Sequence, residues 1–279
     1  MKKISISTST KLCCTSIFFF VLLFVFYASG ISPAKSVDQP QQTQENVVIL
    51  MYHDLRFQQL GKDSIPAWCT TDLKFREDLQ VLLDLGLFPL SLEQYISGNY
   101  DPEKRYFIIT FDDGYLSNYT IAYPILKSLG IHGDIFAVTD SIGTLDNHFT
   151  FAQAQEMEDS GYVAIHSHTC NHLSFAHSNV SEFTENVLRS LKVLRENLTE
   201  GPLRGFAYPN GAYSREIAES LSNAGVAFQM VQAPLADDSQ DPLPSGLLYR
   251  ISIGYDSDVR QMVTDFFEQC GKYSQPIKV

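Results

Sequence analysis

The sequence predicts an α/β fold, a distorted (β/α) barrel of about seven parallel strands. Two observations carry this prediction. Short, continuously apolar runs, typical of strands buried on both faces, alternate with longer segments that bear a single apolar stripe. Polar residues then follow several of these runs directly, as expected where active-site side chains gather at the carboxyl ends of barrel strands.

The expected strands are short and their spacing leaves room for a helix between most of them. The first is VVILMYH at 47–53 and the second is YFIITF at 106–111. Further strands are expected at 134–138, 162–165, 205–208, 227–231 and within LYRISI at 248–253. Strands that alternate with helices at this spacing form parallel βα units.

The expected helices each show apolar residues three or four positions apart. Residues 73–85 place Phe75, Leu79 and Leu82 on one stripe, and Gly86 is a natural stop. In the segment 117–129, Pro124 predicts a kink. The remaining helices are expected at 151–159, 180–198, 215–224 and 259–270.

The N-terminal 30 residues resemble a targeting segment. Lys2 and Lys3 precede an unbroken apolar run from Ile17 to Ala28, nearer in length to a signal-peptide core than to a membrane span. Residues 1–30 are therefore expected to be a signal peptide or an uncleaved membrane anchor, both of which predict a secreted protein or one on the outer face of the cell membrane. Residues 31–46 are expected to be a polar linker, and 47–279 one catalytic domain.

The charge of the chain argues against nucleic acid as a partner. The formal net charge is −12. The leader contains three lysines and no acidic residue, so the rest of the chain is more acidic still. Binding of phosphate backbones needs clustered Lys and Arg, so no nucleic-acid partner is expected, and membrane contact only through the N-terminal segment.

Four expected strand ends bring histidines and carboxylates to one rim. The runs end in His53-Asp54, in Asp112-Asp113-Gly114, in His166-Ser167-His168 and in Pro209-Asn210-Gly211. Each stretch alone has an ordinary explanation, such as a turn or a packed histidine. Their coincidence at strand ends predicts an active site.

The residue types fit a hydrolytic metal centre. A catalytic zinc site keeps three protein ligands and an open position, and two histidines with one carboxylate are a common set. His168 and His172 can share an ion if the chain turns helical after the strand, and one carboxylate of Asp112/Asp113 completes the set. The other carboxylate can act as general base towards a water activated by the metal, and His53 can protonate a leaving amine.

TFDDGY at 110–115 and HTCNH at 168–172 resemble the first two motifs of the polysaccharide deacetylases, the NodB-homology or carbohydrate esterase 4 family, and FAYPNGAY at 206–213 is similar to the third. The resemblance implies a distorted barrel, a divalent metal (zinc first, with Co²⁺, Ni²⁺ or Mn²⁺ as alternatives) and removal of acetyl groups from a polysaccharide or oligosaccharide. It implies Asp113, His168 and His172 as metal ligands and Asp112 as base. Tyr208, Pro209 and Asn210 would form the substrate or oxyanion segment.

Two departures refine the resemblance. The family's late Leu-x-x-His motif is missing, and LMYHD at 50–54 supplies His53 instead, similar to a permuted subgroup that acts on poly-N-acetylglucosamine. The arginine that orients the base in the third motif is replaced by Ala207, and Arg250 is a candidate substitute.

Three alternatives for the activity stay open from the residues. The leading hypothesis is an N-deacetylase acting on poly-N-acetylglucosamine, peptidoglycan or a chitin-like polymer. The others are an O-acetyl esterase and an inactive polysaccharide-binding module. His132 and His148 are expected on the surface, and His166 either as a packing residue of the barrel or as a hydrogen-bond partner of a ligand.

Overall fold

The computed structural model describes residues 44–58, 65–199, 203–232 and 247–273. These residues belong to a compact unit that spans Thr43–Val279. The expected leader and most of the expected linker lie outside the described residues. The end of that linker, Gln44–Asn46, is a short 3-10 helix of the unit, and the Gln44 amide bonds both backbone groups of Tyr249.

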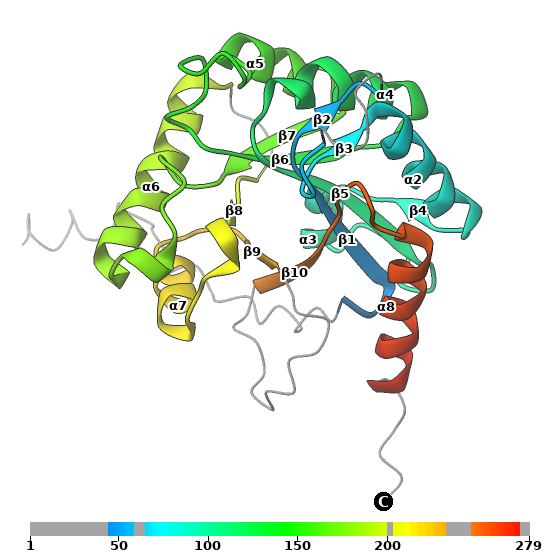
Figure 1. The fold of residues 1–279 in the computed structure, drawn as a ribbon. Coiled ribbons are helices and arrows are strands. Elements are labelled where there is room, and N and C mark those ends of the chain that lie inside the picture. The colour runs from blue at the N-terminus through cyan, green and yellow to red at the C-terminus, as the bar shows by residue number, and fades with distance from the viewer. Residues whose placement is uncertain (1–43, 59–64, 200–202, 233–246, 274–279) are drawn as a thin grey trace, which may run out of the picture. The chain divides into compact units, whose positions relative to one another are not determined.

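The unit is built on a parallel sheet whose pairing order is β1-β10-β9-β8-β7-β6-β5-β4 (Figure 1). β1 (Val47–Tyr52) also pairs with β5 (Tyr106–Asp113), so the pairing returns to its first strand and the sheet is barrel-like. The other strands are β4 (Phe88–Pro89), β6 (Gly133–Ala137), β7 (Val163–Ser167), β8 (Phe206–Ala207), β9 (Gln229–Gln232) and β10 (Leu247–Ser252). The predicted fold class is confirmed.

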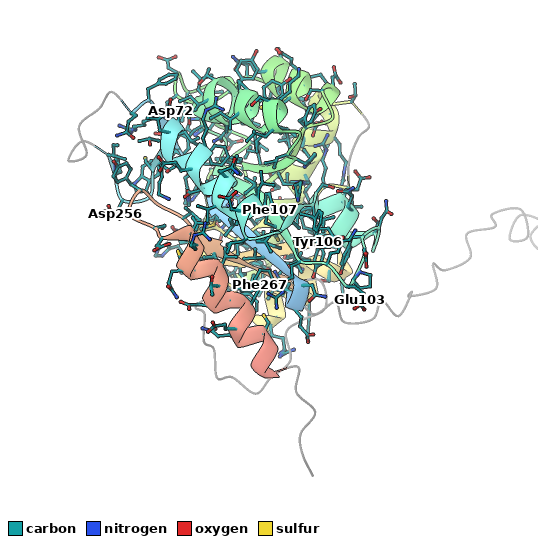
Figure 2. The ribbon with its side chains drawn as sticks, turned by 90° about the vertical axis from the view of Figure 1, so that its right-hand side faces the viewer. Asp72, Glu103, Tyr106, Phe107, Asp256 and Phe267 are labelled. Atoms are coloured by element: carbon teal, nitrogen blue, oxygen red, sulfur yellow. The ribbon has the colours of Figure 1, made fainter. Side chains whose placement is uncertain are left out.

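Helices cover the outer face of this sheet, as Figure 1 shows. They are α2 (Asp72–Asp84), α4 (Tyr123–Leu129), α5 (Phe151–Asp159), α6 (Val180–Asn197), α7 (Arg215–Asn223) and α8 (Val259–Tyr273). α8 carries Phe267 into the same buried cluster as Phe107 of β5 (Figure 2). Within the described ranges, no helix has both the length and the apolar content that crossing a bilayer would need.

Three local features differ from the predictions. The segment expected as one kinked helix at 117–129 begins as a π-helix, Asn118–Ala122, and Pro124 sits harmlessly in the first turn of α4. α3 (Leu92–Ile96) was not expected. Neither were the two-residue strands, which are β4 and the paired β2 (Leu55–Arg56) and β3 (Thr70–Thr71), because such short elements leave no periodic pattern in the sequence.

Strand parity separates the two faces of the sheet. Val47 and Ile49 of β1 and Ile108 of β5 pack in a cluster on the inner face, whereas Val48 and Phe107 pack outward against the helices. The same alternation puts the later inner-face positions of each strand at the carboxyl end of the sheet, where the predicted site residues occur.

Candidate active site

His53, Asp112, His168 and Arg250 share the inner-face parity of their strands. β1 and β5 pair with Tyr52 opposite Phe111, so His53 follows at the level of Asp112. Asp112, His168 and Arg250 are all nearly fully buried. The fold therefore gathers residues from β1, β5, β7 and β10 at one end of the sheet.

Asp112 is held by a bidentate ion pair with Arg250. The two guanidinium nitrogens lie 2.6 and 2.7 Å from the two carboxylate oxygens, and Arg250 also donates to the Thr110 hydroxyl at 3.3 Å. Burial by itself would raise the pKa of Asp112, but the charges of Arg250 and His168 outweigh burial and lower this pKa to about 2. The carboxylate is thus ionised and fixed in orientation. Arg250, the candidate substitute for the arginine that Ala207 replaces, is thus the residue that pairs with Asp112.

Asp113 turns back towards the same place as Asp112 because the backbone leaves the strand there. Its φ is 73°, and Gly114 follows with φ 86° and no room for a Cβ, which would lie 2.9 Å from the Ala137 Cβ. As a result both carboxylates approach one imidazole nitrogen. Asp112 Oδ2 is 3.8 Å and Asp113 Oδ1 is 3.7 Å from His168 Nε2.

The tautomer of His168 follows from its other neighbour. His168 Nδ1 lies 3.0 Å from the carbonyl oxygen of Ala207. A carbonyl only accepts, so Nδ1 donates its proton and Nε2 presents a lone pair to the two carboxylates. Burial lowers the pKa of His168 in spite of Asp112 and Asp113 nearby, which favours this neutral form.

His172 reaches the site from a turn rather than from a helix, so the predicted helical turn is wrong. Thr169 and His172 have φ values of 70° and 58°, and the Leu173 N–H donates to the Thr169 hydroxyl at 3.0 Å. This turn places His172 Nε2 3.5 Å from Asp113 Oδ1. Within the described chain the four non-glycine residues with positive φ are Asp113, Thr169, His172 and Asn210. Asp113, Thr169 and His172 belong to the segments that supply the candidate ligands, where such strained backbone is typical of function, and Asn210 follows the end of β8.

Asp113, His168 and His172 fit a divalent metal ion. One donor atom from each lies within 4.8 Å of the others. Two imidazole nitrogens and one carboxylate oxygen match the preference of zinc for such mixed sets. The His168 lone pair is already aimed, because the hydrogen bond to Ala207 orients the ring as partners of ligating histidines do.

His53 stands beside this group with a buried ring nitrogen. Its charge contributes to the low pKa of Asp112, so it lies within electrostatic reach of that carboxylate. The His53 carbonyl accepts from the Asn118 amide at 2.9 Å, whereas His53 Nδ1 has no hydrogen-bond partner among the described residues. The ring meets Trp68 edge-on, with centroids 6.1 Å apart.

Within the predicted oxyanion segment, residues 208–210, Asn210 is the residue whose backbone N–H can serve as a donor to a ligand. The Tyr208 N–H donates to the Met230 carbonyl at 2.9 Å, and the Tyr208 hydroxyl contacts Gln229 in the core. Pro209 has no N–H. Asn210, with φ 57° and an exposed side chain, is the position that can turn its N–H towards a ligand.

A groove of about 410 Å³ opens beside the three candidate ligands. Asp113 and His172 line it together with Tyr115, His148 and Leu145. The Tyr115 ring stacks on Trp68 with centroids 5.6 Å apart, and Trp68 is 43% exposed. Burial and Asp113 both raise the pKa of Tyr115, so its hydroxyl stays protonated beside that carboxylate.

These aromatic residues were not predicted as part of the site. Tyr115 lies within the TFDDGY motif, which was a usable signal, whereas Trp68 precedes a two-residue strand and gives none. His148, expected on the surface, packs 5.0 Å from Tyr115. His132, also expected on the surface, is instead three-quarters buried, with its Nδ1 3.5 Å from the buried Asp134 carboxylate.

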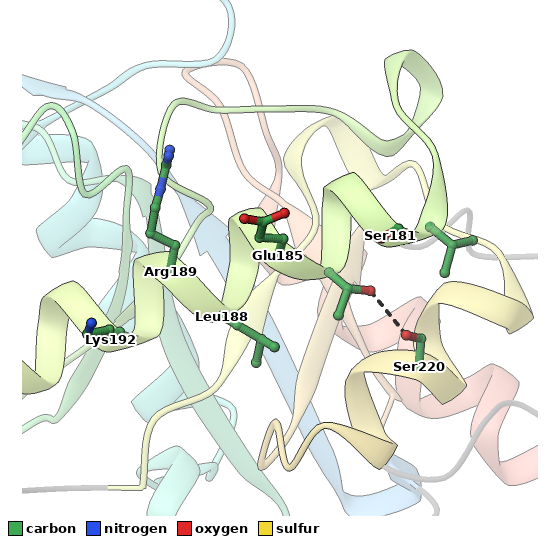
Figure 3. Close-up of a pocket in the computed structure, with 8 residues that line it drawn as sticks. Ser181, Glu185, Leu188, Arg189, Lys192 and Ser220 are labelled. Carbon is green, nitrogen blue, oxygen red and sulfur yellow. Dashed lines mark hydrogen bonds between the residues drawn. The ribbon is translucent and has the colours of Figure 1, made fainter.

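A larger hollow of about 790 Å³ lies between α6 and α7 (Figure 3). Its lining includes Leu188, Arg189 and Ser220, and the Thr184 and Ser220 hydroxyls are 3.1 Å apart across it. No predicted site residue lines it. Two of the candidate metal ligands, Asp113 and His172, line the smaller groove instead.

Comparison with known proteins agrees with this geometry. Residues 99–229 match the family model described as polysaccharide deacetylase. YxkH of Bacillus subtilis strain 168, which is named as a polysaccharide deacetylase, is 29% identical over 189 residues, covering 67% of this chain and 64% of that protein. The poly-beta-1,6-N-acetyl-D-glucosamine N-deacetylase of Staphylococcus epidermidis is 26% identical over 184 residues, covering 60% of this chain and 63% of its own length.

The chain thus spans a little under two thirds of the length of these curated relatives. Among solved structures, the Streptococcus pyogenes deacetylase PplD in complex with acetate superposes with a TM-score of 0.65 at 22% identity, covering 78% of this chain and 96% of that one. This likeness concerns the fold. Residues 99–229, which the family model matches and which carry the motifs of the candidate site, therefore belong to a polysaccharide deacetylase domain of the NodB-homology type.

Proposed function

We propose that this protein is an exported, metal-dependent hydrolase that removes N-acetyl groups from an amino-sugar polysaccharide. One observation carries the proposal. Two carboxylates with different surroundings approach the same neutral imidazole, one locked by Arg250 and the other beside His172. Two neighbouring carboxylates whose environments differ this much can divide the roles of base and metal ligand.

Asp113, His168 and His172 would hold the metal, with zinc as the first choice and Co²⁺, Ni²⁺ or Mn²⁺ as alternatives. When bound, such an ion lowers the pKa of a water molecule towards about 7 and polarises an acyl oxygen.

Asp112 would take the proton from the attacking water. The bidentate pair with Arg250 keeps this carboxylate ionised and pointed into the site. His53, on the neighbouring strand, would deliver a proton to the departing sugar amine, and the backbone N–H of Asn210 would stabilise the developing oxyanion. Tyr208 and Pro209 would shape this segment without donating, because their backbone N–H groups are engaged or absent.

The substrate proposed is a polymer of N-acetylglucosamine. The named Staphylococcus epidermidis relative supports this choice, as do the exposed Trp68 and the stacked Tyr115 beside the groove, since aromatic faces bind the apolar faces of sugar rings. Export is proposed from the sequence of residues 1–30. Fractionation of cells that express the full chain tests it, and recovery in the cytosol would exclude it.

The activity is tested by metal analysis together with acetate release from β-1,6-linked N-acetylglucosamine oligomers. We expect acetate and free amines from wild type with stoichiometric metal, binding without turnover from Asp112→Asn, and loss of metal from Asp113→Asn. Acetate from acetylated xylan but not from the amino-sugar oligomer would indicate an O-acetyl esterase. Retained metal and no acetate from either substrate would indicate a polysaccharide-binding module.

A further inference from the structure

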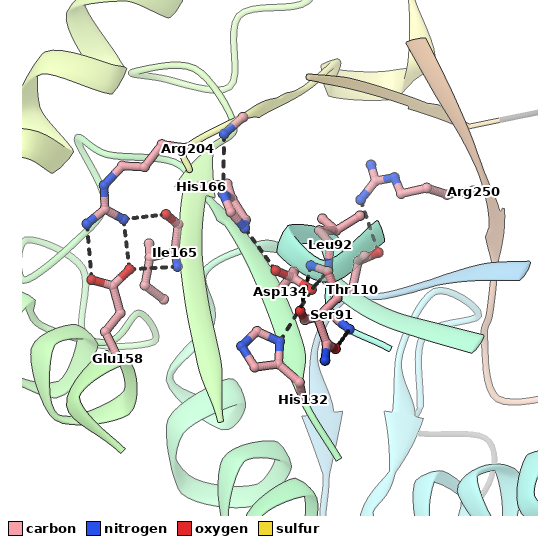
Figure 4. Close-up of polar contacts among 12 residues, drawn as sticks. Ser91, Leu92, Thr110, His132, Asp134, Glu158, Ile165, His166, Arg204 and Arg250 are labelled. Carbon is pink, nitrogen blue, oxygen red and sulfur yellow. Dashed lines mark hydrogen bonds and ion pairs between the residues drawn. The ribbon is translucent and has the colours of Figure 1, made fainter. Parts of the chain in front are cut away.

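Behind the candidate site, the inner face of the sheet holds a second buried polar cluster, drawn in Figure 4. Its centre is Asp134 on β6, which is 1% exposed. Two donors bond this carboxylate, His166 Nε2 at 3.0 Å and the Leu92 N–H at 3.3 Å, and the His132 ring lies beside it with Nδ1 3.5 Å from Oδ2. A carboxylate held this way is a rigid anchor for the His166 ring.

The tautomer of His166 is set by its two partners. Nε2 donates to the Asp134 carboxylate, which only accepts, and Nδ1 accepts the Gly205 N–H at 3.3 Å. The ring is held between Phe136 and Phe228, with centroids 5.0 and 5.2 Å away. His166 therefore links β6 to the residue just before β8, and both of its ring nitrogens are hydrogen-bonded.

The hydrogen bond from Gly205 to His166 reinforces the pairing of β7 with β8, which we call the β7–β8 seam. β8 has only two residues and is registered to β7 by a single pair, Ser167 with Phe206. The Ser167 N–H donates to the Gly205 carbonyl at 3.0 Å, and His166 adds a side-chain bond to the same residue. A Cβ at Gly205 would lie 2.2 Å from the Phe228 ring, so the backbone is in close contact there.

What depends on this seam is His168. The carbonyl of Ala207, two residues after Gly205, fixes the His168 ring through the 3.0 Å contact to Nδ1. A shift of β8 along β7 would move that acceptor and release the ring, and the Nε2 lone pair would no longer be held towards Asp113.

We infer that Asp134 and His166 are positioning residues for His168, acting through β8 and the Ala207 carbonyl. The inference rests on the proposed metal site and deepens it, because neither residue is itself a ligand. His166→Phe removes both hydrogen bonds of the ring and keeps an aromatic of similar shape. His166→Gln retains one donor and one acceptor, and Asp134→Asn removes the anchor charge at nearly constant volume.

The first readout needs no metal. In the metal-free protein, ¹⁵N NMR of labelled histidines should show His168 as a single Nδ1–H tautomer in wild type. His166→Phe and Asp134→Asn should give a mixture of tautomers, and His166→Gln should recover most of the wild-type signal. Asp134→Asn keeps the test open if His166→Phe does not fold. An unchanged His168 tautomer in the folded variants would overturn the inference.

The second readout is the dissociation constant for Zn²⁺, with the Co²⁺ absorption spectrum as a probe of ligand geometry. Changing the partner of a ligating histidine typically weakens binding 10–100-fold, and we expect a loss of about that size in His166→Phe. The matched control is Ile165→Ala, a neighbour on β7 that is buried on the opposite face. It should lower the melting temperature and leave Zn²⁺ affinity and the Co²⁺ spectrum unchanged.

Equal losses of affinity in Ile165→Ala and His166→Phe would reduce His166 to a packing residue and overturn the inference. If the proposed metal site is wrong, the wild-type protein itself will bind no Zn²⁺. The tautomer of His168 in the metal-free variants would still decide whether His166 positions that ring.

Discussion

At the scale of single residues, the pairing of Asp112 with Arg250 makes the behaviour of the metal-free protein in acid predictable. The pKa of Asp112 is about 2 in the folded chain, against an ordinary value of 3.8. A depressed pKa adds stability that is fully present above 3.8 and is lost as the pH falls towards 2. This contribution is roughly 2 kcal/mol at neutral pH.

Arg250→Met should remove that contribution, because burial then raises the pKa of Asp112. The difference in unfolding free energy between wild type and Arg250→Met should shrink between pH 5 and pH 2. Chemical denaturation of the metal-free proteins at several pH values measures it. A difference that does not change with pH would mean that Arg250 does not set this pKa.

His53 allows a second prediction at this scale. A positioned general acid contributes about 10²–10⁴ in rate, so His53→Gln should lower kcat by up to that factor. Metal content should remain that of wild type, since His53 lies outside the candidate ligand set. The loss should be smaller for a substrate with an activated leaving group, which needs no proton. An equal loss for both substrates would argue against His53 as the acid.

At the scale of elements, the loop that carries Trp68 depends on a glycine far along the chain. A Cβ at Gly254 would lie 1.9 Å from the Ala67 carbonyl oxygen, so only glycine allows the segment after β10 to pack against this loop. Gly254→Ala should displace this loop and, with it, the Trp68 ring that stacks on Tyr115.

The expected result for Gly254→Ala is a higher KM for oligomers, approaching that of Trp68→Ala, with metal affinity unchanged. Each kcal/mol of lost stacking corresponds to about a 5-fold rise in KM when KM reflects binding. Ala67→Gly, which leaves the carbonyl in place, is the matched control for a change in the loop itself. A lower kcat at constant KM would place Trp68 outside the substrate path.

The sequence predicted the elements with strong periodicity and could not predict those set by distant contacts. α5 has the bounds expected from its pattern. A capping box formed by Thr150 and Gln153 fixes its first residue, so the local sequence determines where this helix begins. The turn after His168 was misjudged because the spacing of His168 and His172 fits a helix equally well. Asp112 and Arg250, from β5 and β10, meet because β1 pairs with both strands; the family resemblance made Arg250 a candidate, whereas no local pattern indicates this contact.

At the scale of the whole unit, stability depends on how the short β8 is joined to its neighbours. Arg204, just before β8, forms a bidentate pair with Glu158 of α5, with N···O distances of 2.7 and 3.0 Å. Arg204 also donates to the Ile165 carbonyl, and Glu158 accepts the Ile165 N–H at 2.9 Å. These contacts, visible in Figure 4, tie a helix, β7 and the start of β8 on the outer face of the sheet.

Because both side chains of this pair are about 95% buried, removing one should cost more than removing both. Arg204→Met leaves Glu158 as an unpaired buried charge, and we expect a loss of about 3–5 kcal/mol. At roughly 2–4 °C for each kcal/mol, calorimetry should show a clearly lower melting temperature. The double variant Arg204→Met with Glu158→Met should recover much of that loss, since apolar side chains can replace a buried pair at little cost. Additive losses in the double variant would instead mean that each residue stabilises the seam through its separate bond to Ile165.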